Sequence, residues 1–205
     1  MSKPKYWEYG KKFLSKKDKI LKKLILRYKG NLKTRKDPFF SLCKSIVGQQ
    51  ISVQAASSVW NKLENKAKKI TPKNISKLNL RQLSSCGLSR QKISYLRILS
   101  KKFLNKELDI KKMKKMSDQE AIKYLVQVKG IGTWTAEMFL FFNQMRPDIF
   151  PIQDIGLLRA ISINYKTKYP PSSIQLKKLK KKWSPYCTMA TWYLWRSIDP
   201  EPVNY

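Results

Sequence analysis

An all-α protein is the fold class that this sequence predicts. Apolar residues recur at helical spacing along nearly the whole chain, strand-like alternation is scarce, and there is no internal repeat of a fold-defining period. At 205 residues the chain can form one domain or two small lobes, and it is long enough to bury a substantial hydrophobic core.

The individual helices are placed by their apolar periodicity and by signals at their ends. In chain order we expect them at residues 20–28, 39–63, 74–79, 81–85, 90–104, 117–127, 133–143, 155–163 and 173–198. Gly48 falls inside the second segment and is expected to interrupt it with a turn or a close contact. Ser117 and Glu120 form a capping-box pattern at the start of the segment 117–127. The lysine runs at 111–115 and 177–182 are typical of solvated helix faces or of phosphate contacts.

The charge balance favours a polyanionic partner. Lys and Arg number 44 against 13 acidic residues, which gives a net charge of +31 and predicts strong, salt-sensitive attraction to polyanions. Part of the excess has a simpler source, because AT-rich coding raises Lys, Asn and Ile in any protein. The charge therefore supports a nucleic-acid partner without proving one.

Several classes of site and location are excluded by composition. Histidine is absent, which rules out Ser-His-Asp triads, histidine-ligated zinc and imidazole general bases. The cysteines, Cys43, Cys86 and Cys187, are isolated and lack metal-ligand spacing, as is typical of reduced thiols in an intracellular protein. The first residues lack an apolar signal region, and the densest apolar run, 138–142, is too short to span a bilayer. We expect no membrane association and a location in the cytoplasm, on the nucleoid, or in the nucleus of a eukaryote.

The segment Gly130-Ile131-Gly132 predicts a tight hairpin between two helices. Glycines allow backbone geometry that is closed to other residues, and they bring bare amides at a helix N-terminus close to an anion. Small Thr135 and Ala136 follow and allow close helix packing. The pattern favours a hairpin that grips a phosphate backbone, and a plain helical turn is the alternative.

Asp154 is the candidate for chemistry. It precedes the expected helix 155–163, where an aspartate is favoured as an N-cap because its oxygen accepts a hydrogen bond from a free amide. A carboxylate at this position could also stabilise positive charge that develops on a sugar, as in glycoside hydrolysis. The two interpretations are compatible, since a cap would hold the carboxylate still.

Ordered, spaced motifs in this chain resemble those of the helix-hairpin-helix (HhH-GPD) DNA glycosylase superfamily, and within it the DNA-3-methyladenine glycosylase II group. The resemblance covers about residues 40–200, and Tyr6-Trp7 extends it forward. The matching segments are Ser45–Ser52 (SIVGQQIS), Gly87–Ser89 with Lys92, Val128–Phe142, Arg146–Asp154 and Trp183–Trp195.

By this resemblance, Asp154 takes the place of the family's catalytic aspartate, which would stabilise an oxocarbenium ion and help water attack the anomeric carbon. Bifunctional relatives carry a lysine two residues after the second hairpin glycine and form a Schiff base there. This chain has Trp134 at that position, and Lys129 lies before the glycines. The resemblance therefore implies a monofunctional glycosylase that excises alkylated purines of the 3-methyladenine type from duplex DNA, in base excision repair.

The resemblance also implies a base pocket and an inserting residue. Trp134 and Trp195 match aromatic positions that line the pocket of similar enzymes, and Met138 occupies a position that is often aromatic in relatives. Aromatic faces suit a cationic alkylated purine, although ordinary core packing is the alternative for both tryptophans. Gln50 aligns with the residue that such enzymes insert into the duplex when a nucleotide flips out. The alternative for Gln50 is a polar residue bonded to neighbouring backbone.

The hairpin should hold the DNA backbone. The resemblance assigns phosphate contacts to the amides of Gly130 and Gly132, with Lys129 and Thr133 nearby. Similar hairpins bind a monovalent cation through main-chain carbonyls, which would here be those of Val126, Val128 and Ile131.

The implied architecture is a two-lobed helical fold with a cleft between the lobes. The central lobe, 38–134, ends in the hairpin, and residues 1–37 with 135–205 form a second lobe that carries Asp154. The four-cysteine iron–sulfur loop of some relatives is absent, so we expect no cluster, no required cofactor, and a monomer acting on double-stranded DNA with damaged bases. Two alternatives stay open. One is a glycosylase for deaminated or oxidised bases, which would need more hydrogen-bond donors in its pocket. The other is a non-catalytic basic nucleic-acid-binding protein in which Asp154 is only a cap.

Overall fold

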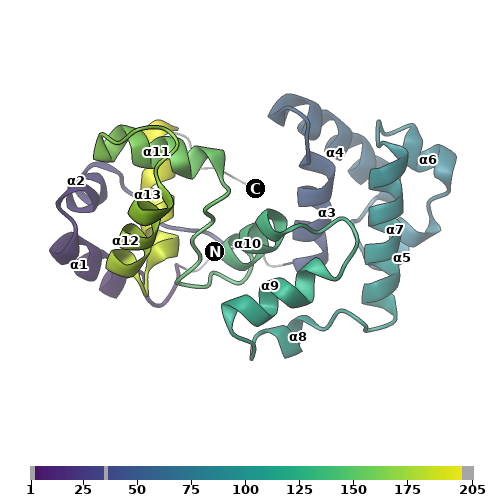
Figure 1. Cartoon of the computed structure of the whole chain (residues 1–205). Helices are drawn as coiled ribbons and strands as arrows, with labels where there is room; N and C mark the ends of the chain where they lie inside the picture. Colours follow the sequence, from purple (N-terminus) through teal and green to yellow (C-terminus); the bar gives the residue numbers. More distant parts are fainter. Residues whose placement is uncertain (1–2, 35–36, 200–205) are drawn as a thin grey trace. The chain divides into compact units, whose positions relative to one another are not determined.

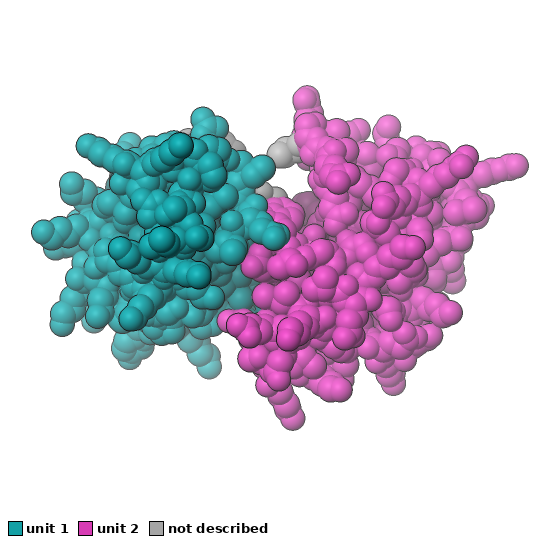
Figure 2. All heavy atoms as spheres, viewed as in Figure 1, with its two compact units in different colours: residues 1–34, 140–204 teal, residues 35–139, 205 magenta. Residues whose placement is uncertain are grey.

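The chain forms two compact helical units. The computed structural model describes residues 3–34 and 37–199, and every regular element within them is a helix, as the sequence predicts (Figure 1). Unit 1 holds residues 1–34 and 140–204, and unit 2 holds residues 35–139, with residue 205 (Figure 2). The chain passes from unit 2 to unit 1 inside helix α10, Thr133–Phe142, which also contains the expected boundary after residue 134.

Unit 2 is built around helix α7, Arg90–Leu104. This helix packs against α3, α5 and α6 and buries Ile93, Leu96 and Leu99 on its inner face. Its range, 90–104, was expected from the apolar periodicity, and the structure adds that Ser89 caps its first turn through the amide of Lys92. The other helices of unit 2 are α3 (Pro38–Gly48), α4 (Val53–Ala67), α5 (Pro72–Lys77), α6 (Leu80–Ser84), α8 (Ile110–Met113), α9 (Asp118–Val126) and the first part of α10.

Local signals set several of these boundaries. The expected segment 39–63 is divided where Gly48 ends α3, and Ser52 then caps α4 through the amide of Ala55. The capping box of Ser117 and Glu120 is present at the start of α9. In α8, which was not predicted, the neighbouring lysines of 111–115 are exposed while Met113 is buried.

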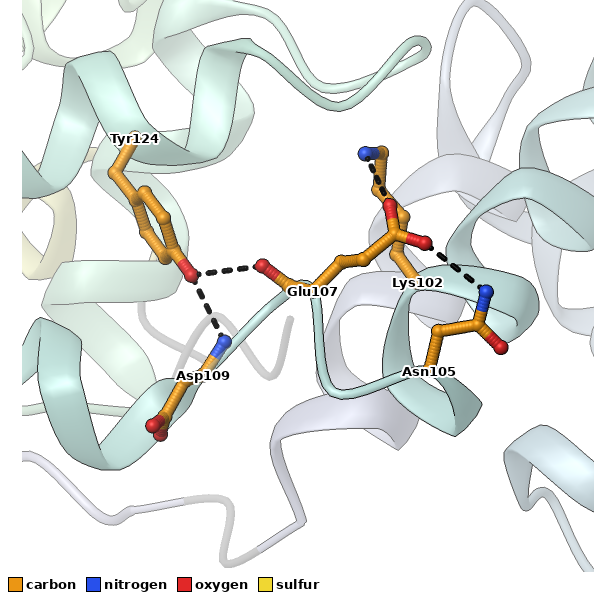
Figure 3. A network of polar contacts seen from close by, with 5 residues as sticks. All are labelled: Lys102, Asn105, Glu107, Asp109 and Tyr124. Carbon is orange, nitrogen blue, oxygen red and sulfur yellow. Dashed lines mark hydrogen bonds and ion pairs between the residues drawn. The ribbon is translucent and has the colours of Figure 1, made fainter.

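A small polar network supports α9, the helix that leads into the hairpin. The hydroxyl of Tyr124 donates to the carbonyl of Glu107 at 3.0 Å and accepts from the amide of Asp109 at 2.9 Å (Figure 3). The Glu107 carboxylate accepts from Lys102 and Asn105 at the end of α7. Tyr124 thus ties α9 to the segment that follows α7.

Unit 1 is built around helix α13, Cys187–Ile198. Every residue of α13 from Cys187 to Trp195 is buried, because the other helices of this unit pack around it. Those helices are α1 (Trp7–Lys17), α2 (Lys19–Arg27), α11 (Ile155–Tyr165) and α12 (Ser173–Trp183).

Two expectations for unit 1 were wrong. The segment 173–198 is two helices, because Pro185 lacks an amide hydrogen and restricts the residue before it. No helix was expected before residue 20, yet Trp7–Lys17 is helical and buries Trp7, Gly10 and Leu14 on one face.

Asp18 connects the helices of unit 1 through a buried carboxylate. Its Oδ1 caps α2 through the amides of Ile20 and Leu21. Burial alone would raise the pKa of Asp18, but hydrogen bonds from Lys182, Trp183, Tyr165 and the Leu21 amide outweigh it and lower the pKa. The side chain is 1% exposed, so this charge is held by its partners.

None of the helices in residues 3–34 and 37–199 is long and apolar enough to cross a membrane. Within the same residues, no three His, Cys, Asp or Glu side chains are grouped to hold a metal ion, and the three cysteines are buried thiols.

Candidate active site and nucleic-acid interface

Asp154 is a buried N-cap in unit 1. The chain turns just before it, where the Asp154 amide donates to the carbonyl of Pro151 at 2.9 Å. Its Oδ1 accepts the amide of Leu157 at 2.7 Å and so caps α11. With 8% of its surface exposed, the carboxylate is held in one orientation at the start of a helix.

A second donor reaches the same oxygen from α13. The indole Nε1 of Trp195 donates to Asp154 Oδ1 at 2.9 Å. The glycine at 156 leaves space for this bond, because a Cβ there would make tight contacts of 3.2 Å with Oδ1 and 3.4 Å with the indole nitrogen. The structure thus brings Asp154 and Trp195 together, with Gly156 leaving room for their bond.

The ring of Trp195 is packed among other aromatic side chains. It lies parallel to Phe142, with ring centroids 5.9 Å apart and planes at 8°, and it is tilted against Phe141 at 5.0 Å. Trp195 is 6% exposed and, with Phe142, Trp192 and Arg196, lines a narrow surface depression. Its indole therefore combines core packing with one polar bond.

Trp134 and Met138, the other expected pocket residues, lie on the part of α10 that belongs to unit 2. Trp134 is half-buried, and Met138 is 2% exposed. Trp134 therefore keeps some accessible surface, whereas Met138 contributes to the packing beneath the surface.

The hairpin lies between α9 and α10, as expected. Gly130 has a φ of +96°, and a Cβ at this position would lie 2.3 Å from the Tyr95 ring, so glycine is required there. Gly132 differs from the expectation: its φ is not positive, and a Cβ there would meet nothing within 4 Å. What Gly132 contributes is open space at the start of α10.

The surface of the hairpin is accessible to a ligand. Lys129, Gly132 and Thr133 are exposed, and α10 begins at Thr133. First-turn amides of a helix point outward from its N-terminus, where the helix dipole favours an anion. This arrangement suits a phosphate group.

The hairpin carbonyls named for a cation come from residues with different surroundings. Val126 ends α9 and is partly exposed, whereas Val128 and Ile131 are buried. The Val128 carbonyl accepts the Ile131 amide at 2.9 Å, which leaves it one further lone pair.

Gln50 lies at the exposed turn between α3 and α4. It has a φ of +55°, which is unusual for a residue with a side chain, and its side chain is exposed. Next to it, Gln49 donates from Nε2 to the Gly130 carbonyl at 2.9 Å and to Thr135 Oγ1 at 3.3 Å. The turn that presents Gln50 is therefore bonded to the hairpin.

Two contributors to these sites were not assigned from the sequence. Gly156 and Gln49 lie close to Asp154 and Gln50 in the sequence, and Gln49 also falls within the matching segment Ser45–Ser52, but neither signal gives their contacts. Their partners, Trp195 and Gly130, are far away in the sequence, so the contacts became visible in the folded chain.

Comparisons with known proteins agree on one family. The model of the family described as "HhH-GPD superfamily base excision DNA repair protein" matches residues 43–185. DNA-3-methyladenine glycosylase 1 of Schizosaccharomyces pombe is 29% identical over 184 residues, which are 87% of this chain and 81% of that protein.

Solved structures show the same similarity. A DNA-3-methyladenine glycosidase from Bacillus halodurans matches with a TM-score of 0.81 and 30% identity, over 93% of this chain and 89% of that one. The 3-methyladenine DNA glycosylase Mag1 of Schizosaccharomyces pombe, in complex with abasic DNA, matches with a TM-score of 0.81 and 25% identity, over 96% of this chain and 100% of that one.

Proposed function

Because the chain belongs to the HhH-GPD superfamily of base excision DNA repair proteins, we propose that it is a DNA glycosylase that excises alkylated purines of the 3-methyladenine type from duplex DNA. The observation that carries the proposal is the buried carboxylate of Asp154, whose Oδ1 is held by the Leu157 amide and the Trp195 indole. A carboxylate fixed before substrate arrives stabilises developing positive charge without reorganising.

The reaction needs little more than this carboxylate and water. The bond between the sugar anomeric carbon and the purine nitrogen breaks, and its electron pair leaves with the base. An alkylated purine is cationic and becomes neutral on leaving, so it departs readily. Asp154 stabilises the oxocarbenium-like sugar while water adds to the anomeric carbon and releases a proton, leaving an abasic site.

The same proposal excludes strand cleavage by a Schiff base. That step requires a lysine amine at the sugar, and the corresponding hairpin position holds Trp134. Lys129 precedes the hairpin glycines and is assigned to DNA contact instead. The expected product is an intact strand with an abasic site.

Base recognition is assigned to aromatic surface. Trp134 is half-buried, and stacking on an electron-poor purine is assigned to its ring. Met138 and Trp195, the other residues assigned to base recognition, are both nearly fully buried.

DNA binding is assigned to unit 2. The exposed Lys129, Gly132 and Thr133, with the Gly130 backbone, bind phosphates, and Gln50 enters the duplex where a nucleotide has flipped out. We infer that the protein binds DNA as a monomer. Its net charge of +31 should make its affinity for DNA fall steeply as salt rises.

We propose that the hairpin also holds a monovalent cation through main-chain carbonyls. Those of Val126, Val128 and Ile131 would hold it, and its charge would add to the attraction for phosphate. Replacing potassium with a bulky organic cation at equal ionic strength should then weaken DNA binding, while thermal unfolding in the two salts reports whether the ion also stabilises the fold.

The test of the proposed function is base release from alkylated duplex DNA by wild type and by Asp154→Asn. An asparagine oxygen can still accept both hydrogen bonds, so the variant should fold and bind DNA while its rate falls about 100-fold or more. Samples are analysed with and without alkali, because a monofunctional enzyme gives strand breaks only after alkali treatment.

The alternatives predict different results. Breaks without alkali would contradict the monofunctional assignment. Release of deaminated or oxidised bases, with alkylated bases left in place, would show that the enzyme acts on neutral lesions instead of alkylated purines. Equal binding by both proteins with no base release from any substrate would leave a nucleic-acid-binding protein in which Asp154 is a helix cap.

A further inference from the structure

Gln49 makes a contact within unit 2 that the proposed reaction does not use. Its side-chain Nε2 donates to the Gly130 carbonyl at 2.9 Å and to Thr135 Oγ1 at 3.3 Å. A carbonyl oxygen can only accept, so the NH₂ end of the amide must face Gly130. The bond joins the end of α3 to the hairpin across 81 positions of sequence.

The turn that follows Gln49 is held at both ends. On one side, Lys92 of α7 donates from Nζ to the Val47 carbonyl at 2.7 Å, and burial lowers the pKa of this lysine. On the other side, Ser52 caps α4 through the amide of Ala55. Between these points stand Gln49, bonded to the hairpin, and Gln50, exposed at the turn.

The backbone of this turn is strained at the residue that faces solvent. Gln50 has a φ of +55°, in a region that costs a residue with a side chain about 1 kcal/mol or more. Strain of this kind persists where surrounding contacts over-determine the backbone, and the Gln49 and Lys92 bonds are such contacts.

We propose that Gln49 is a positioning residue that locks the Gln50 turn to the hairpin, so that phosphate binding and insertion into the duplex occur on one preassembled surface. Gly130 is the shared point, because its backbone belongs to the hairpin and its carbonyl accepts from Gln49. DNA held by the hairpin then meets Gln50 already aimed at the duplex, and no ordering of the turn is needed on binding.

The inference rests on the proposed function, since it takes the hairpin and Gln50 as DNA contacts. It adds that Gln49, without touching DNA, makes these two contacts cooperate. If that is correct, Gln49 acts through Gln50, and its removal should matter little once Gln50 is gone.

The experiment is a double-mutant cycle on wild type, Gln49→Met, Gln50→Ala and the double variant. Methionine keeps the length and bulk of Gln49 and removes its donors. The probe is a duplex with a tetrahydrofuran abasic analogue and 2-aminopurine beside it, which reports affinity by anisotropy and local unstacking by fluorescence. Gln82→Met is the matched control, because it removes a glutamine hydrogen bond within unit 2, to the Asn79 amide at the start of α6, that involves neither the hairpin nor the Gln50 turn.

We expect Gln49→Met to weaken binding about tenfold and to reduce the 2-aminopurine signal, with Gln82→Met within about twofold of wild type. The double variant should bind no more weakly than Gln50→Ala. Thermal unfolding of each variant shows that the fold is kept.

Two outcomes would overturn the inference: unchanged binding in Gln49→Met, or losses that simply add in the double variant. Base release from alkylated DNA is measured separately on the same proteins. If wild type releases no base yet the cycle is non-additive, the proposed function fails while the coupling stands. If wild type releases base and the losses add, the coupling alone fails.

Discussion

Replacing either hairpin glycine with alanine adds one methyl group, but we expect Gly130→Ala to lower stability and Gly132→Ala to lower DNA affinity. At Gly130 an alanine Cβ would lie 2.3 Å from Tyr95 Cγ and 2.5 Å from Cδ2, on a backbone whose φ is +96°. Backbone strain and overpacking each cost about 1–3 kcal/mol, so Gly130→Ala should lower the free energy of unfolding by about 2–6 kcal/mol. That is a large part of the total stability of a domain, which is about 5–15 kcal/mol.

At Gly132 the same methyl group meets open space. Nothing lies within 4 Å of the added Cβ, so Gly132→Ala should change the free energy of unfolding by less than about 1 kcal/mol. The methyl group would nevertheless occupy the space through which a phosphate approaches the start of α10. DNA affinity should therefore fall by about tenfold or more, which is the loss of one good hydrogen bond to a charged group.

The assay pairs urea unfolding, followed by tryptophan fluorescence, with binding to an abasic-analogue duplex at one fixed salt concentration. A Gly130→Ala protein as stable as wild type would refute the packing argument at Tyr95. If Gly132→Ala binds DNA as tightly as wild type, the start of α10 is not part of the DNA interface. The two variants carry the same chemical change two positions apart, so each is the control for the other.

Three further predictions concern single side chains. Hydrogen bonds lower the pKa of Asp18, so its stabilisation is complete above about pH 4 and is lost as pH falls through the lowered value. Urea unfolding should show Asp18→Asn about 2–4 kcal/mol less stable at pH 7, with the gap closing in acid. Trp195→Phe keeps the ring but loses the bond to Asp154, so single-turnover base release should slow about 10- to 100-fold, while Trp192→Phe stays near wild type. An unchanged rate would show that this bond does not matter. Gln50→Gly should be as stable as wild type or up to about 1 kcal/mol more stable, because it relieves a positive φ, yet it should bind an abasic duplex more weakly. A Gln50→Gly variant that is less stable than wild type and binds DNA equally well would contradict both the strain at Gln50 and the role of its side chain in DNA binding.

Much of the helical structure was predictable from neighbours in the sequence. The helix at 90–104 was placed at its observed ends because its apolar periodicity is set by residues a few positions apart. The capping box of Ser117 and Glu120 and the break at Gly48 are equally local. The segment 173–198 was predicted as one helix because apolar periodicity continues on both sides of Pro185, although the proline itself is a local signal for a break.

At the Asp154 site and at the hairpin, too, local features were predictable from the sequence, whereas contacts between distant residues were not. The sequence alone determined that Asp154 would begin a helix and that Gly130 would turn a hairpin, because each depends on residue type and short spacing. That Trp134 replaces the lysine of bifunctional relatives stays a prediction from the family resemblance. Tertiary structure alone decided that the Trp195 indole donates to Asp154, that Gly156 leaves room for it and that Gln49 bonds Gly130. The physical reason is that such contacts join residues from helices far apart in the chain, so they exist only after packing has brought those helices together.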